Sequence, residues 1–459
     1  MSNKSSLNER LEQSKVTGKQ GGIYASVISG HFLDGYMINV IGVTMMGLVA
    51  AFHLNASQMG FMASSVYYGM CFGALFGGPI ADRFGRKKVF ITAIIIFSLA
   101  SIGCAAAPTY GVFLAFRLLT GVGLGIEVPV SMTFIHEYMP VKIRAISVAS
   151  ATFFWTIASV AASLLGLWLM RTPDPGWRWM FAAGVVPVVI IIPALIIVVP
   201  ESVHFLLTRG KVTEAKAIVD KVSSVPGDDT ADEAALETAN KLSVAEQISV
   251  KGMFHGKFTL QTICVWLMNL ICGFVFFGLG SWLPGILMKM GFDFVHSLSY
   301  TAAISLSGAI GSLIGGYFIH KFGFRITMTG FFLIAGVSAI VWGTTGSSTT
   351  MIIWALLTSM FGFGAGGLLF VYVTSLYPSS VRATGTAWAA FSSRVGGLIA
   401  PVVLGVIVAS PNIPNIVFFL CLGIPLLIAC VIALTTAIDF RGKTLEDVHA
   451  KLLEGKSVH

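Results

Sequence analysis

Twelve long apolar stretches occupy most of this chain, and each is long enough to cross a lipid bilayer. A helix that spans the hydrocarbon core needs about 20 predominantly apolar residues. Only 11% of the 459 residues are charged, whereas a soluble domain carries about a quarter. The chain is therefore predicted to be an all-α integral membrane protein with twelve transmembrane helices. The predicted spans are 23–51, 57–81, 88–107, 110–137, 145–170, 178–199, 260–289, 295–319, 326–345, 350–376, 383–409 and 413–438.

The basic residues are distributed unevenly along the chain. Most of the 29 Lys and Arg residues lie in the two tails and in the loops that follow spans 2, 4, 6, 8 and 10. Loops on the cytoplasmic side of a membrane carry such an excess. We therefore expect a multi-pass protein of the cell (inner) membrane with both termini in the cytoplasm. This placement also accounts for the net charge of +8 without a nucleic-acid partner.

A single long polar segment at 201–257 divides the spans into two sets of six. The predicted organisation is a cytoplasmic tail, a six-helix bundle, a cytoplasmic linker, a second six-helix bundle and a second cytoplasmic tail. These regions are 1–22, 23–200, 201–257, 258–439 and 440–459. Within the linker, 214–222 and 231–242 have the pattern of short amphipathic helices.

The two halves repeat the same loop patterns at the same spacing. The sequence DRFGR at 82–86, after span 2, recurs as HKFGF at 320–324, after span 8. Arg144, after span 4, and Arg382, after span 10, lie in similar loops. Both pairs are offset by 238 positions. A shared offset in two unrelated motifs predicts two pseudo-symmetric bundles with a site between them.

Four full charges lie within the spans, namely Asp34, Arg117, Glu127 and Arg394. A charge in hydrocarbon costs about 3 kcal/mol or more unless it is paired or faces water, so such residues often mark a transport pathway. Asp34 and Glu127 are candidate proton carriers, because a carboxylate in a low-dielectric cavity can exchange a proton near neutral pH. The planar guanidinium of Arg394 is suited to bind a carboxylate of an anionic substrate. Structural ion pairs or hydrogen bonds are the alternative for each residue.

The loop GPIADRFGRKK at 78–88 places one acid among four basic residues. A topology signal alone needs no acid, so we expect Asp82 to accept hydrogen bonds from neighbouring arginines and to latch the two bundles on the cytoplasmic side. The predicted gate residues are Asp82, Arg83, Gly85, Arg86, Glu137, Arg144 and Arg382.

This loop resembles the signature of the major facilitator superfamily, and the resemblance covers nearly the whole chain. The segments RLLTGVGLGIEVPV at 117–130, PESVHFL at 200–206 and RGKTLE at 441–446 resemble signatures of metabolite:proton symporters related to sugar porters. The segments FLDGY at 32–36, SWLP at 281–284 and SRVGG at 393–397 resemble bacterial carriers for aromatic acids, nicotinate-like acids and other metabolites.

The resemblance implies a fold of two six-helix bundles that works by alternating access and usually as a monomer. It implies that Arg117 influences proton transfer, and that Tyr36, Trp155, Asn269 and Trp388 are candidates for the substrate pocket beside Arg394. The partners are then a small molecule, protons and the lipid bilayer, with no cofactor or metal.

Two departures from the family patterns restrict the substrate. Sugar porters carry a Gln-Gln pair in span 7, whereas this span has one amide, Asn269, which argues against an ordinary hexose. Aromatic-acid carriers usually show a second acid three residues after the first in span 1, where this chain has Met37. Met37 therefore argues against a strict assignment to aromatic acids.

The predicted function is proton-coupled uptake of a small organic acid or related metabolite. The alternatives are a proton-coupled sugar or polyol symporter, a proton-coupled exporter of organic cations or drugs that uses Glu127 as its cation site, and a membrane sensor that transports nothing. The chain contains no phosphate-binding loop, zinc-protease motif or nucleophile elbow, so we expect neither direct ATP coupling nor an enzyme.

Overall fold

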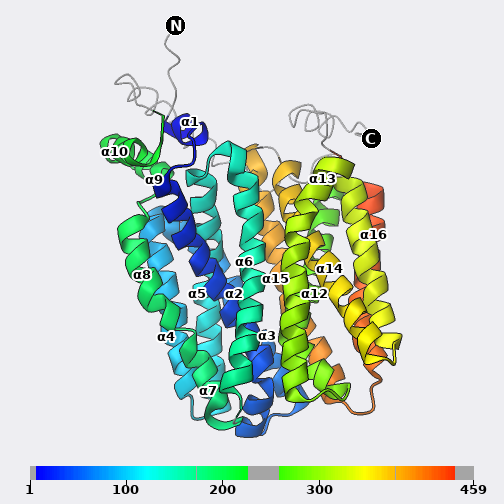
Figure 1. The fold of residues 1–459 in the computed structure, drawn as a ribbon. Coiled ribbons are helices and arrows are strands. Elements are labelled where there is room, and N and C mark those ends of the chain that lie inside the picture. Colours follow the sequence, from blue (N-terminus) through cyan, green and yellow to red (C-terminus); the bar gives the residue numbers. More distant parts are fainter. Residues whose placement is uncertain (1–6, 172, 226–257, 378, 440–459) are drawn as a thin grey trace.

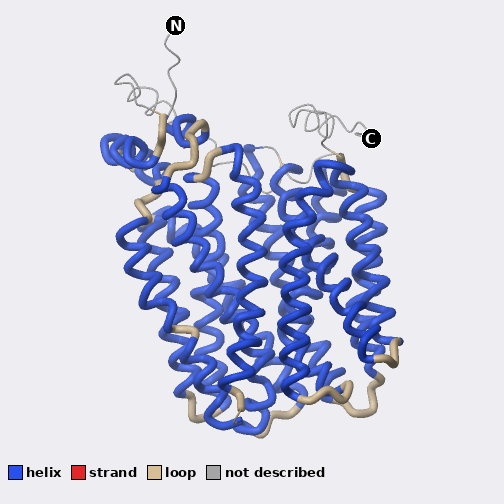
Figure 2. Tube along the Cα trace, in the orientation of Figure 1, coloured by secondary structure: helices blue, strands red, loops and turns tan. Residues whose placement is uncertain are grey.

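The computed structural model describes residues 7–171, 173–225, 258–377 and 379–439. These ranges fold into helices joined by short turns (Figure 2). The first half contains α2 (Gly18–Phe52), α3 (Ala56–Phe84), α4 (Arg86–Ala106), α5 (Tyr110–Tyr138), α6 (Val141–Leu169), α7 (Pro173–Ala183) and α8 (Val186–Val198). The second half contains α12 (Phe258–Lys289), α13 (Phe294–Thr344), α14 (Ser348–Leu376), α15 (Ser379–Ala409) and α16 (Asn415–Thr436). Three short helices precede or follow the first half, namely α1 (Leu7–Glu12), α9 (Val203–Thr208) and α10 (Val212–Val222).

The described residues contain twelve helices that are long and apolar enough to cross a membrane. This confirms the predicted number of spans, although their ends differ by a few residues. The first helix begins at Gly18 because Thr17 caps it. The Thr17 side chain accepts from Gln20 N–H, and the Gln20 side chain accepts from Thr17 N–H, which forms a capping box. The second predicted linker helix, 231–242, lies outside the described residues.

Glycines at equivalent places in the repeat reverse the chain between spans. Gly85, between α3 and α4, has φ 104°, and Gly323, which interrupts α13, has φ 80°. Glycine adopts this left-handed region without the steric cost that a Cβ brings. Because Gly323 breaks its regular geometry, α13 supplies two spans, 294–319 and 321–344. The sixth span consists of α7 and α8 together.

The first-half helices and the second-half helices form two groups that meet along a seam (Figure 1). Across this seam α2 packs against α12, α3 against α15, and α6 against α13. The α3–α15 and α6–α13 pairs exchange equivalent members of the repeat, as a pseudo-twofold arrangement requires. The start of α2, the end of α16 and the short helices α1, α9 and α10 lie at one end of the molecule, which we call the terminal face (Figure 1).

The close contacts across the seam lie in the half of the molecule away from the terminal face. A Cβ on Gly42 in α2 would collide with the carbonyl oxygen of Gly280 in α12. Ser64 Oγ in α3 donates to the Leu398 carbonyl oxygen in α15 at 2.9 Å. Ser159 in α6 and Ser305 in α13 share a hydrogen bond of 3.1 Å between their hydroxyl oxygens. These contacts close the seam at the opposite face.

Candidate functional site

The centre of α2 presents two titratable side chains on one helical face. His31 and Asp34 are one turn apart, and 8% and 2% of their surfaces are exposed. Residues three apart on a helix are neighbours on its surface. The next residue, Gly35, lies against the carbonyl oxygen of Trp155 in α6, so α6 covers this face closely. The pair is therefore buried at the middle of the first span.

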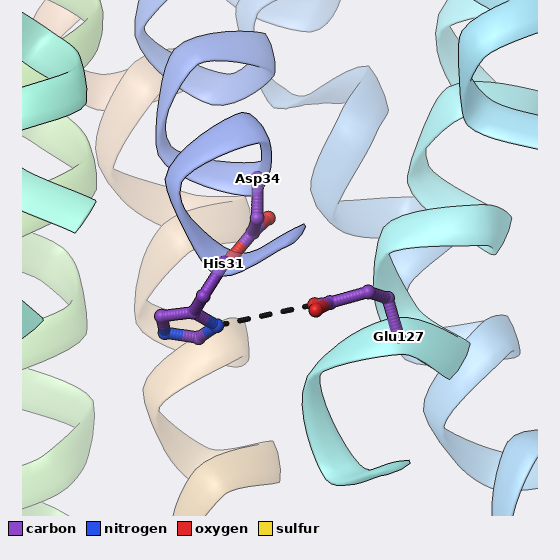
Figure 3. A group of neighbouring side chains, drawn as sticks. All are labelled: His31, Asp34 and Glu127. Atoms are coloured by element: carbon purple, nitrogen blue, oxygen red, sulfur yellow. Dashed lines mark ion pairs between the residues drawn. The ribbon is translucent and has the colours of Figure 1, made fainter. Parts of the chain in front are cut away.

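Glu127, near the middle of α5, faces the same place and is fully buried. Gly30 of α2 leaves the space for it, since a Cβ there would lie 3.2 Å from Glu127 Oε1. Figure 3 shows the imidazole of His31 and the carboxylate of Glu127 turned toward each other, with His31 Nδ1 3.9 Å from Glu127 Oε2. Side chains of α2 and α5 thus converge on one point.

His31, Asp34 and Glu127 form a compact group. One imidazole nitrogen and one carboxylate oxygen from each acid lie within 4.8 Å of one another. His31 Nδ1, Asp34 Oδ1 and both oxygens of Glu127 have no hydrogen-bond partner among the described residues. A buried carboxylate without partners is costly, so it favours binding a proton or an opposite charge. The group, which we call the carboxylate cluster, is therefore suited to gain and lose a proton.

Arg394 brings a positive charge to the cluster from the other half of the molecule. It lies in α15, is 6% exposed and interacts electrostatically with Asp34 and Glu127. Its Nε has no hydrogen-bond partner among the described residues. Three donors beside a guanidinium give a divalent metal ion an incomplete and repelling environment, so we assign no metal to the cluster.

A small cavity of about 20 Å³ lies on the seam beside the cluster. This space holds about one water molecule. Its lining includes Asn39, Trp155 and Ser159 from the first half and Gly280, Ser305 and Phe363 from the second. Trp155 connects the two features, because it lines the cavity and its backbone carbonyl lies against Gly35, the residue after Asp34. The carboxylate cluster and the cavity therefore lie next to each other on the seam between the halves.

Two of the residues expected near the site are engaged inside the first half. Arg117 donates from Nη1 to the Met37 carbonyl oxygen at 2.9 Å and lies over the Phe181 ring at 5.8 Å. The Tyr36 hydroxyl donates to the Met180 carbonyl oxygen in α7 at 2.8 Å. The structure thus turns the polar ends of both side chains toward α2 and α7, outside the carboxylate cluster.

Two second-half candidates also lie apart from the cavity lining. Asn269 donates from Nδ2 to the Val265 carbonyl oxygen one turn earlier in α12, at 2.9 Å. Trp388 is 38% exposed and stacks on Trp266, with ring centroids 5.5 Å apart. Of the predicted pocket residues, the structure brings Trp155 and Arg394 to the site and leaves Tyr36, Asn269 and Trp388 outside it.

The predicted gate motif forms a network at the terminal face. Arg86 lies 3.5 Å from both Asp82 Oδ1 and Glu137 Oε2. Glu137 also accepts from Ser202 Oγ and from His204 N–H, each at 2.7 Å. These contacts join the α3–α4 turn, the end of α5 and the start of α9. In the part of the chain that the structure describes, they tie the first half to the linker and do not reach the second half.

Arg83 and Arg144 contact the first half, the linker and the amino-terminal helix α1. The guanidinium of Arg83 lies 5.5 Å from the Phe84 ring, and its carbonyl oxygen accepts from Arg209 at 2.7 Å. Arg144 forms an ion pair of 3.1 Å with Glu12, at the end of α1. The side chain of Arg382 lies outside the described residues.

His31 was absent from the sequence-based site, although one signal pointed to it. It is polar, lies within a span and stands three residues before Asp34. A neutral imidazole carries no charge, so His31 was not among the four charges that marked the candidate site. Asn39, Ser159 and Ser305 were also missed, since isolated serines and amides are common in membrane helices and only the folded chain collects them on one cavity.

A family model described as "Sugar (and other) transporter" matches residues 23–452. The chain belongs to this family. It is similar to the niacin transporter NiaP of Acinetobacter baylyi, with 31% identity over 91% of this chain and 94% of that protein. It is also similar to the benzoate transport protein of that organism, with 28% identity over 94% and 92% of the two chains.

Solved structures share the fold. The inward-open structure of the xylose transporter XylE from E. coli matches with a TM-score of 0.78 and 19% identity, covering 94% of this chain and all of that one. The protein is thus a multi-pass membrane transporter with the major facilitator fold of two six-helix bundles, as the sequence predicts, and not an enzyme.

Proposed function

We propose that this protein takes up a small organic acid together with protons by alternating access. The observation that carries the proposal is the position of the charges. Asp34 and Glu127 belong to one half of the molecule, and the guanidinium of Arg394 belongs to the other. Among the described residues, Asp34 Oδ1 and both carboxylate oxygens of Glu127 have no hydrogen-bond partner. Charges of opposite sign that face each other across a moving seam couple proton binding to the movement of the halves.

The proposed cycle follows from the charge balance. While Asp34 is ionised, its carboxylate attracts the guanidinium of Arg394 electrostatically. Protonation of Asp34, with Glu127 beside it, weakens this attraction and leaves Arg394 available for a substrate carboxylate, which its planar fork binds well. The loaded site then carries less net charge, and reorientation through a closed barrier costs less. Loss of the proton restores the internal pair and favours release.

Aromatic side chains around the cavity favour an acid that carries a ring. Trp155 and Phe363 both line it, with ring centroids 6.4 Å apart. Phe276 stacks on Phe363 with centroids 4.3 Å apart. Ring faces and edges of this kind pack against an aromatic ligand. The similar transporters are named for niacin and benzoate, both aromatic monocarboxylates. We propose this substrate class, with nicotinate as the first probe.

The closed side of the seam is compatible with the proposed direction of transport. Its described contacts close the face opposite the termini, and the excess of Lys and Arg assigns the terminal face to the cytoplasm. In the proposed cycle, this is the side of the membrane on which the substrate is released.

Proteoliposomes that contain the purified full chain test the proposal. An imposed pH gradient should drive accumulation of labelled nicotinate or benzoate. Asp34→Asn should abolish this accumulation but retain exchange of internal for external substrate, since exchange needs no net proton movement. Asp293→Asn, at an exposed acid outside the spans, is the matched control. Undiminished uphill uptake by Asp34→Asn would contradict the assignment of the proton site.

The family match also keeps a sugar or polyol symporter as a second candidate. In the same vesicles, competition by xylose or glucose without competition by aromatic acids would favour it. Proton-driven efflux of organic cations from everted vesicles would favour an exporter.

A further inference from the structure

His31 is a buried imidazole for which the proposed cycle has no role yet. It lies one turn before Asp34, between that residue and the start of α2 at the terminal face. Its Nδ1 has no hydrogen-bond partner among the described residues and lies 3.9 Å from Glu127 Oε2. An imidazole gains and loses a proton near neutral pH more readily than any other side chain.

Burial disfavours a charged imidazole at His31, and the carboxylates near it oppose this effect. The charges that act on it are those of Glu127 on α5, Asp34 on α2 and Arg394 on α15. Two of the three are carboxylates, and Glu127 is the nearer, since it alone lies within ion-pair distance of the ring. Glu127 would therefore stabilise an imidazolium when it forms. The positive charge of Arg394 would destabilise it and favour loss of the proton.

The position of His31 gives the proton a direction. His31 is 8% exposed, whereas Asp34 is 2% exposed and Glu127 is fully buried. An imidazole nitrogen of His31 and a carboxylate oxygen of Asp34 lie within 4.8 Å of each other. One water molecule can bridge this gap in a proton transfer. Two turns nearer the terminal face, the hydroxyls of Tyr24 and Ser150 share a hydrogen bond. Polar groups therefore continue from the cluster toward the terminal face.

We propose that His31 is the relay that carries the proton from Asp34 toward the terminal face. The inference rests on the proposed proton symport. The Asp34 carboxyl loses its proton and becomes a carboxylate, and the imidazole of His31 takes that proton and becomes an imidazolium opposite Glu127. The imidazolium then gives the proton to water on the terminal side. No other bond forms or breaks, and His31 returns to its neutral form.

A relay changes the rate of proton release but not the final ratio of internal to external substrate. In proteoliposomes with labelled nicotinate, His31→Gln should lower the initial rate of pH-driven uptake by about tenfold or more, the lower end of what a positioned proton-transfer group contributes. The final accumulation ratio and the rate of nicotinate exchange should stay near the wild-type values. His296→Gln, at an exposed histidine in the first turn of the eighth span, is the control and should change nothing.

Each other outcome overturns the relay. An unchanged uptake rate would show that protons leave without His31. A parallel loss of exchange would show a role in substrate binding or in packing. A lost accumulation ratio would make His31 a proton carrier in its own right. Failure of the wild-type protein itself to accumulate any acid would count against the proposed function.

A second measurement needs no substrate. In detergent-solubilised protein labelled with ¹³C at histidine Cε1, the resonance missing from His31→Gln identifies His31. It should titrate with pH, and Glu127→Gln should move its midpoint to lower pH by removing the carboxylate that stabilises the imidazolium. A resonance that does not titrate, or a midpoint that Glu127→Gln leaves in place, would rule out the relay.

Discussion

Gly42 of α2 lies directly against the backbone carbonyl of Gly280 in α12, at the point where the two halves meet. Small residues allow membrane helices to approach to backbone contact. Here the contact joins different halves of the molecule, so it must separate whenever the opposite face opens. The glycine pair is therefore a part of the seal and not only of the packing.

Gly42→Leu should prevent the opposite face from closing, because the new side chain would occupy the position of the Gly280 carbonyl oxygen. The variant should bind substrate from the opposite side but transport little. A single cysteine at Ser64, which contacts Leu398 across the seam, should react faster with an impermeant maleimide in this background. Gly316→Leu, at a glycine with open space around it, is the control. Equal labelling of the two variants would show that the seam closes despite the leucine.

Arg394→Lys should keep the positive charge of the cluster but weaken binding of an anionic acid. Lysine lacks the planar fork that binds a carboxylate through two hydrogen bonds, and a hydrogen bond to a charged group is worth about 1.5–3 kcal/mol. We expect the Kd of nicotinate for the purified protein to rise by about tenfold or more.

Equilibrium binding of labelled nicotinate measures this effect. Arg171→Lys, at an exposed arginine between α6 and α7, should bind as the wild type does. Unaltered affinity in Arg394→Lys would remove Arg394 from the substrate site and leave it a structural partner of Asp34.

Glu137→Gln should loosen the linker from the first half. Glu137 accepts two hydrogen bonds of 2.7 Å from Ser202 and His204 and pairs with Arg86. Removal of a charged acceptor from such a buried network costs about 1–3 kcal/mol. We expect a lower Tm in detergent and faster hydrogen exchange in α9. Glu214→Gln breaks only an exposed pair with Lys211 and should leave both quantities unchanged. Protection of α9 equal to that of the wild type would contradict the role of Glu137.

Arg10→Ala should release α10 from α1. Arg10 is 2% exposed, donates to Asp220 Oδ1 at 2.7 Å and reaches the Val225 carbonyl oxygen through Nε and Nη2. Loss of this side chain leaves two acceptors without their donor, so hydrogen exchange across 212–222 should accelerate. Lys19→Ala, at an exposed lysine of α2, should not affect it. Unaltered exchange in Arg10→Ala would show that other contacts hold α10.

Much of the fold was predictable because the bilayer restricts what a chain can do. Apolar length specified the spans, and the repeated loops implied that the halves are related, which the left-handed Gly85 and Gly323 now show in the backbone. The start of the first span was less predictable. Residues 18–22 are polar or small, and a capping box at Thr17 starts the helix before the apolar stretch begins.

The candidate site was predictable only in part. Asp34, Glu127 and Arg394 were recognisable singly, because a charge within a span has few harmless explanations. His31 was not recognised, since an uncharged imidazole has many. Tyr36, a pocket candidate that the resemblance implied, is placed outside the cluster. It lies two residues after Asp34, but this spacing turns its hydroxyl toward α7 and away from the cluster.

Composition and spacing alone determined that this chain spans a membrane twelve times in two related halves, because a bilayer accepts few backbone arrangements and every span must satisfy its own hydrogen bonds. Tertiary structure decided which polar side chains meet. Helices distant in the chain bring His31, Asp34, Glu127 and Arg394 to one point on the seam. Rotation of each helix about its axis sets that meeting, and this rotation depends on packing against neighbours that local sequence does not specify.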